Sequence, residues 1–191
     1  PCTAILLLKS KIIPLSLLAM RILAALLFSV PLSCSLISCG GPLGARDFVS
    51  YQFQYGKTAL LQNGIAYAPR RAPAAVHRAI AAGNRLQKKP YKWGGGHAVL
   101  NDRGYDCSGA VSYVLREAGL MSGHMSSRGF LNYGQSGPGK WITLYVRNGH
   151  VFLTVAGLRI DTGWGGGRKG PRWQTGSRPG KGHIMRHPPG L

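Results

Sequence analysis

A cysteine that directly follows an aspartate is the first candidate for chemistry in this chain. Cys107 lies in "YDCSG", and the apolar residues after it recur at helical spacing on one face, up to Gly119. Asp106 is a favourable N-cap, so Cys107 is predicted in the first helical turn, where free N–H groups and the helix dipole favour a thiolate. A thiolate is a nucleophile. The alternative interpretation is that Asp106 only caps the helix and Cys107 only packs.

A nucleophilic cysteine needs a base, and His150 is the best candidate among the six histidines. The segment "WITLYVRNGHVFLTVAGLRIDTGW" predicts strands at 141–146, 150–155 and 158–162, with Asn148-Gly149 as a hairpin turn. Pairing the last two strands across residues 156–157 puts Asp161 diagonal to His150, at a Cα separation of about 7 to 8 Å. The pattern therefore predicts a Cys, His, Asp constellation.

The elements that must position these residues are two helices and a sheet. Helical spacing predicts helices at 73–86 and 107–118, and we expect both to pack on an antiparallel sheet formed by the strands after Trp141. The predicted fold class is α+β. Residues 46–69 are compatible either with strands or with a lead-in segment that covers the cleft.

The charge of the chain indicates an anionic partner. Twenty-four Lys and Arg against five Asp and Glu give a formal net charge of +19 over 191 residues. We expect no nucleic-acid partner, since the apolar N-terminal region predicts export and the chain lacks the aromatic-basic motif of an RNA-binding domain. We also expect no metal and no cofactor: zinc-site spacing is absent, and Gly94–Gly96 is not followed by the Lys-Ser or Lys-Thr of a phosphate loop.

The N-terminal region is predicted to direct export. Residues 5–39 are largely apolar but contain no uninterrupted run long enough to span a membrane. They fit a secretory signal that starts at Met20, with an apolar segment at 22–30. "LISCG" is similar to the lipobox of bacterial lipoproteins, which predicts a lipid on Cys39, a membrane anchor and a location in the cell envelope. The alternative is an ordinary signal peptide cleaved nearby.

This leader leaves Cys107 as the single free thiol of the exported domain. Cys2 and Cys34 belong to the leader, and Cys39 would carry lipid. Exported proteins usually pair their cysteines or lack them. An unpaired cysteine is therefore either a buried small hydrophobic residue or a group kept for chemistry.

Three ordered motifs resemble those of the NlpC-type (NlpC/p-sixty) cell-wall cysteine peptidases, which are papain-like. They are "PYKWGGGH" from Pro90, "YDCSG" from Tyr105 and "NGHVFLTVAG" from Asn148. The resemblance covers residues 73–191 and implies Cys107 as the nucleophile, His150 as the base and Asp161 as the orienting residue. It also implies that Tyr91 helps to form the oxyanion site. One departure is Lys140, which stands where the family usually has a non-catalytic aspartate.

The glycine-rich, basic segment 163–182 has two interpretations. Five of its residues could clasp an anionic polymer, or the segment could be a mobile solvated loop, which its glycine content favours. The five residues are Trp164, Arg168, Lys169, Trp173 and Arg178.

The sequence therefore predicts a leader at 1–39, a linker or lead-in segment at 40–72 and a catalytic domain at 73–191. The resemblance implies a peptidase that cleaves peptidoglycan stem peptides between D-glutamate and a diamino acid, with anionic envelope polymers as further partners. Two alternatives remain: an inactive wall-binding lipoprotein, or an amidase or acyltransferase on the same fold.

Overall fold

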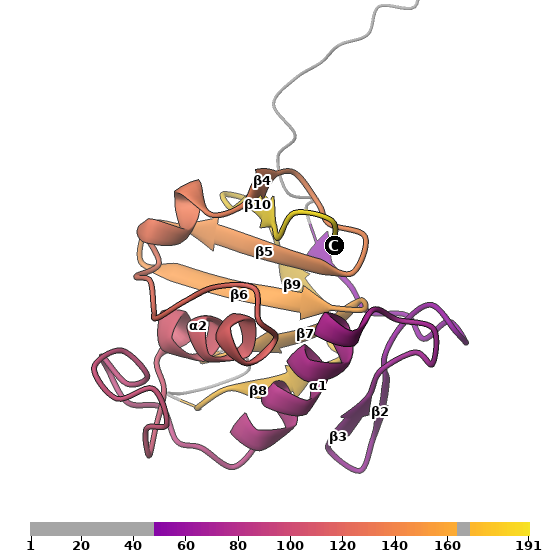
Figure 1. The fold of residues 1–191 in the computed structure, drawn as a ribbon, viewed down its shortest axis with the longest axis horizontal. Coiled ribbons are helices and arrows are strands. Elements are labelled where there is room, and N and C mark those ends of the chain that lie inside the picture. Colours follow the sequence, from indigo (N-terminus) through magenta and orange to yellow (C-terminus); the bar gives the residue numbers. More distant parts are fainter. Residues whose placement is uncertain (1–47, 164–168) are drawn as a thin grey trace, which may run out of the picture. The chain divides into compact units, whose positions relative to one another are not determined.

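An antiparallel sheet of six strands organises the fold (Figure 1). The structure is a computed structural model that describes residues 48–163 and 169–191. The strand order is β4-β10-β5-β6-β7-β8, so the last strand of the chain inserts between β4 and β5. These strands are β4 (Gln135–Ser136), β5 (Ile142–Arg147), β6 (His150–Val155), β7 (Leu158–Asp161), β8 (Arg172–Gln174) and β10 (Ile184–His187).

The centre of the sheet is the β5-β6-β7 meander, and it matches the predicted strands closely. The β5–β6 hairpin turns at residues 148–149, because Arg147 pairs with His150. The β6–β7 hairpin turns at Ala156 and Gly157, whose φ angles of 46° and 78° are those of a tight turn with the twist that hairpins prefer. The pairing of Leu153 with Ile160 confirms the predicted register.

Two helices pack on one face of this sheet. α1 (Ala74–Leu86) and α2 (Cys107–Glu117) begin and end within one residue of the predicted bounds. The α2 start is fixed by the Asp106 cap, and its end by Gly119, which adopts φ 77° one residue past the C-cap.

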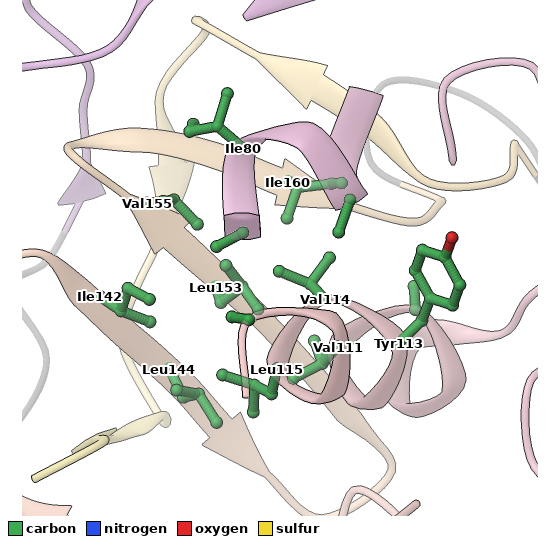
Figure 2. Close-up of a cluster of buried hydrophobic side chains, with 14 of the residues drawn as sticks. Ile80, Val111, Tyr113, Val114, Leu115, Ile142, Leu144, Leu153, Val155 and Ile160 are labelled. Carbon is green, nitrogen blue, oxygen red and sulfur yellow. The ribbon is translucent and has the colours of Figure 1, made fainter. Parts of the chain in front are cut away.

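The core lies between the helices and the sheet (Figure 2). Val111, Val114 and Leu115 of α2 point toward Leu144 and Leu153 of the sheet, and all five side chains are at most 2% exposed. Truncating one of these leucines to alanine typically costs about 2 to 5 kcal/mol. The helices packed on an antiparallel sheet confirm the predicted α+β class.

The residues before α1 are part of this domain. We expected a linker or lead-in segment at 40–72, and its described part contains β1 (Phe48–Val49) and the hairpin of β2 (Leu60–Gln62) and β3 (Ile65–Tyr67). β1 pairs with β9 (Arg178–Pro179). Asn84 of α1 holds β3 by hydrogen bonds of 2.9 Å to both the N–H and the C=O of Ala66.

Within the described residues, every member of the core cluster lies between 59 and 191. A segment of this length that buries its own core is large enough to fold as an independent domain. No helix of the described part is sufficiently long and apolar to traverse a bilayer.

The mobile-loop interpretation of residues 163–182 is wrong for its described part. β8 extends the sheet by pairing with β7, and Trp173 at its centre is only 6% exposed. The Trp173 indole N–H donates to Asn84 Oδ1 at 2.8 Å, which joins β8 to α1. The polymer-clasping role is therefore also wrong for Trp173, while Lys169 is exposed and Trp164 and Arg168 lie outside the described residues.

Candidate active site

Cys107 is the first residue of α2, as predicted, and it is half-buried. Asp106 has extended backbone angles, and its Oδ1 accepts the Gly109 N–H at 2.7 Å, which is the N-cap geometry. Cys107 therefore lies in the first turn of α2, at the end where the free backbone N–H groups and the positive end of the helix dipole are found.

The glycine loop before α2 packs tightly against the start of this helix. The Gly95 carbonyl accepts the Asp106 N–H, and the Gly94 N–H donates to Asp106 Oδ2 at 3.0 Å. A Cβ at Gly109 would collide with the Gly95 carbonyl oxygen. The glycines of "GGGH" and "DCSG" thus allow two backbone segments to approach each other beside Cys107.

A second His–Asp pair, not predicted from the sequence, supports this helix start. His97 Nε2 lies 3.1 Å from both carboxylate oxygens of Asp106 and 3.2 Å from Ser108 Oγ. Because an ionised carboxylate only accepts, Nε2 carries the proton. The signal in the sequence was the histidine that ends "GGGH", nine residues before Asp106.

His150 links Cys107 to Asp161. Its Nε2 lies 3.0 Å from Asp161 Oδ1, and this leaves Nδ1 as the ring nitrogen for the interaction with Cys107. Burial works to lower the pKa of His150, but hydrogen bonds and charge interactions with Asp161 and Cys107 outweigh it and raise the pKa to about 9. The imidazolium is therefore the favoured form at neutral pH.

The Asp161 side chain is fully buried, and four groups contact its two oxygens. Oδ1 accepts from His150 and from the Thr162 N–H at 2.8 Å. Oδ2 accepts from Arg159 at 2.8 Å and from Arg178 at 2.7 Å. Such charge-assisted bonds hold a carboxylate in one orientation, so the side chain that orients His150 is itself rigidly held.

Arg178 belongs to this site, which corrects the prediction that placed it in a polymer-clasping or mobile loop. It is 6% exposed, and its guanidinium lies 4.6 Å from the centre of the Phe152 ring. Arg159 lies 6.0 Å from the same ring. No pattern in the sequence indicates these contacts, because Arg178 reaches Asp161 from β9, on a segment whose composition is typical of a loop.

His183 is a further residue of the site that the sequence analysis passed over. It is 6% exposed, and its ring centre lies 6.4 Å from that of His150 and 5.3 Å from that of Phe152. Burial lowers the pKa of His183, with the cationic groups of Arg147, Arg178 and His150 acting in the same direction, although its bond to the Gly180 carbonyl opposes them. The His183 imidazole is therefore uncharged at neutral pH and packs beside His150 and Phe152.

The backbone of Tyr91 lies beside the segment that leads into Cys107. Its backbone forms a parallel bridge with Tyr105, two residues before Cys107, and its side chain is half-buried. A role for its hydroxyl in the oxyanion site stays a prediction. Cys39 lies outside the described residues.

The arrangement has the parts of a thiol nucleophile, a base and an orienting acid. It brings Cys107, His150 and Asp161 together in the predicted order. In the described part of the chain, no three His, Cys, Asp or Glu side chains are grouped to hold a metal ion. Cys107, His150 and Asp161 are side chains of the kinds that together support nucleophilic attack.

Solved structures resemble this domain. The peptidoglycan hydrolase RipB of Mycobacterium tuberculosis is 22% identical, with a TM-score of 0.46, over 61% of this chain and 68% of RipB. The P60 domain of an antigen from M. avium paratuberculosis is 19% identical, with a TM-score of 0.42, over 59% of this chain and 92% of that domain.

A variant of the resuscitation promoting factor interacting protein RipA is 23% identical, with a TM-score of 0.40, over 68% of this chain and 71% of RipA. No family model and no curated protein matches the chain.

Proposed function

We propose that this protein is an exported cysteine peptidase that hydrolyses amide bonds in peptidoglycan stem peptides. The observation that carries the proposal is the position of His150, which interacts with Cys107 at the start of α2 and bonds the buried Asp161 through its other ring nitrogen. A purely structural role for Cys107 would require neither the imidazole nor its orienting carboxylate.

The proposed reaction proceeds in two steps. With the Cys107 proton held by His150 as an imidazolium, the thiolate attacks the amide carbonyl carbon. The Cys107 backbone N–H and the Tyr91 hydroxyl stabilise the resulting oxyanion, and one such donor is worth roughly 3 to 4 kcal/mol when well placed. His150 then protonates the leaving amine, the C–N bond breaks, and a thioester forms. Water hydrolyses the thioester and restores the thiol.

The cell wall is the substrate that the sequence motifs imply, and the charge of the chain supports it. A formal net charge of +19 favours association with the anionic polymers of a bacterial envelope. The proposed scissile bond joins D-glutamate to a diamino acid. An acyltransferase would form the same thioester, so the identity of the released products distinguishes the two reactions.

We further propose that the protein is exported and anchored through a lipid on Cys39, as "LISCG" indicates. Mass spectrometry of the protein purified from bacterial membranes tests this directly. We expect a mature N-terminus at Cys39 with the added mass of its acyl groups. An unmodified N-terminus after an ordinary signal cleavage would contradict the lipid anchor but not the enzyme.

The first test of the enzyme is digestion of purified peptidoglycan by the protein and by Cys107→Ala. Ser122→Ala is the control, because Ser122 is exposed and lies outside the site. We expect stem-peptide fragments from the unmodified protein and the control, and none from Cys107→Ala. If none of the three releases fragments although all bind the wall, the wall-binding lipoprotein is the better interpretation.

A further inference from the structure

Exposed apolar side chains gather on the segment that precedes α1. Most large hydrophobic residues of the described chain are buried, but five exposed ones lie between residues 53 and 67. Tyr55 is 94% exposed and Tyr67 is 52% exposed. The five are Phe53, Tyr55, Leu60, Ile65 and Tyr67. Such a concentration marks an interaction surface rather than the scattered exposure that is normal for a soluble domain.

Three cations share this surface. Lys57, Arg70 and Arg71 line a cavity of about 600 Å³ together with four of the five apolar residues. Within the described residues none of the three forms an ion pair, and the described acids, Asp102, Asp106, Glu117 and Asp161, are all paired elsewhere. The cavity therefore has apolar walls and uncompensated positive charge.

This combination matches the chemistry of a membrane surface. Tyrosine and phenylalanine side chains insert at the headgroup level of a bilayer, and arginine and lysine bind anionic phospholipid headgroups. The proposed lipid site, Cys39, is only nine residues before the first described residue, so an anchored chain would hold this segment close to the bilayer.

We propose that Lys57, Arg70 and Arg71, with the surrounding aromatic residues, form a docking surface for anionic phospholipids. This surface adds to the lipid anchor of the proposed function and does not require it. We name it the docking surface, defined by residues 53–60, 65 and 67–71.

Docking would orient the active site away from the bilayer. The Ala59 N–H donates to the Ala156 carbonyl at 2.8 Å, so the docking surface is fixed to the β6–β7 turn. His150 begins β6 at its other end, about 17 Å away at the usual rise of a strand. Figure 1 shows β2 and β3 beyond the end of β6 that leads into β7, with the β5–β6 turn at the opposite end.

The test is co-sedimentation of residues 40–191, which lack the apolar leader, with vesicles. One set contains phosphatidylcholine with 30% phosphatidylglycerol, by design, and the other contains phosphatidylcholine alone. Each lysine or arginine near an anionic surface strengthens membrane binding about 5-fold. The triple variant K57Q/R70Q/R71Q should therefore bind the anionic vesicles on the order of 100-fold more weakly. Tyr55→Ser should weaken binding to both sets.

The matched control is K88Q/R103Q/R128Q, which removes the same charge from exposed residues elsewhere. Equal losses in the two triple variants would overturn the proposal, since net charge alone would then explain the binding. Inorganic phosphate at constant ionic strength should not displace the vesicles, and displacement would indicate a free-anion site instead. Hydrolysis of soluble wall fragments should be unchanged in K57Q/R70Q/R71Q, so failure of docking and failure of the proposed enzyme are separate results.

Discussion

Arg178 Nη1 lies 2.7 Å from Asp161 Oδ2, the carboxylate oxygen that His150 does not use. His150 and Arg178 therefore act on different oxygens of Asp161, and Arg178, together with Arg159 on the same oxygen, helps to fix the direction in which Oδ1 faces the imidazole. Arg178 is a positioning residue, because it acts on the reaction only through Asp161.

Replacing Arg178 should impair catalysis without removing any member of the triad. We expect Arg178→Met to lower kcat/KM on the order of 100-fold, because a misplaced catalytic group costs about this much. Loss of a buried charge-assisted bond should also lower the free energy of unfolding by about 1.5 to 3 kcal/mol. Steady-state kinetics and urea unfolding measure the two effects.

Two further variants separate positioning from stability. Arg178→Lys retains the charge but not the planar fork, so it should recover part of the stability and less of the activity. Lys181→Met, at an exposed cation of the same segment, should leave both quantities unchanged. Full activity in Arg178→Met would contradict the positioning role.

The activity should fall at high pH as His150 loses its proton. The pKa of His150 is raised to about 9, so kcat/KM should decline through that pH. In Asp161→Asn the carboxylate that raises this pKa is gone, and the decline should move to lower pH. Glu117→Gln removes a carboxylate paired with Arg85, away from the triad, and should leave the decline near pH 9.

The same pKa makes stability depend on pH with a defined sign. A folded-state pKa above the ordinary 6.5 means that the native state binds the His150 proton more tightly than the unfolded chain does. The stabilisation is complete below about pH 6.5 and is lost as pH rises through about 9. The difference in unfolding free energy between the protein and His150→Gln should therefore shrink over this interval, and a difference that is constant with pH would contradict the assignment.

Asp106 should contribute to the stability of the fold mainly as the N-cap of α2. Asp106→Ala removes the bond to the Gly109 N–H and leaves the Gly94 N–H and His97 without their carboxylate, so we expect a loss of about 2 kcal/mol. Asparagine is an equally good N-cap, and Asp106→Asn should lose less than half of that amount. Thermal unfolding of both variants gives the comparison. Equal losses would assign the effect to the charge of Asp106 rather than to its cap.

Gly83 should not tolerate a side chain. A Cβ on this residue of α1 would collide with the indole of Trp173, which is held in place by its bond to Asn84. Overpacking of this kind costs about 1 to 3 kcal/mol, even though alanine is the better helix former. Gly176→Ala is the control, because nothing lies within 4 Å of its Cβ position. Chemical denaturation should show a loss for the first variant and no loss for the second.

The fold and the site could be predicted from the sequence where local patterns determine the structure. Helical spacing and an N-cap define α2, and alternation with a tight turn defines the β6–β7 hairpin that brings Asp161 to His150. They could not be predicted where the contacts join residues that are distant in the chain. Trp173 and Arg178 lie in a glycine-rich segment that has no regular periodicity, and only their tertiary partners make them a core residue and a partner of Asp161.

The turn between β2 and β3 also has a local signal in the sequence. Asn63-Gly64 has the composition of a tight hairpin turn, and the φ angles of 50° and 77° at these residues join β2 to β3. The segment between residues 46 and 69 could have been assigned a hairpin on this dipeptide, but its strands are too short to show alternation.

The pairing of Val49 with Arg178 also bears on the order of folding. These residues lie near the two ends of the described chain, so β1 cannot pair with β9 until almost the whole polypeptide is available. Contacts between such distant residues form late, because closing a long loop has a large entropic cost. The β1–β9 pair, in which Arg178 of the active site takes part, would then be among the last native contacts to form. Until β1 and β9 pair, Asp161 would be held by Arg159 and the Thr162 N–H alone on this account, and the site would reach its full rigidity only at the end of folding.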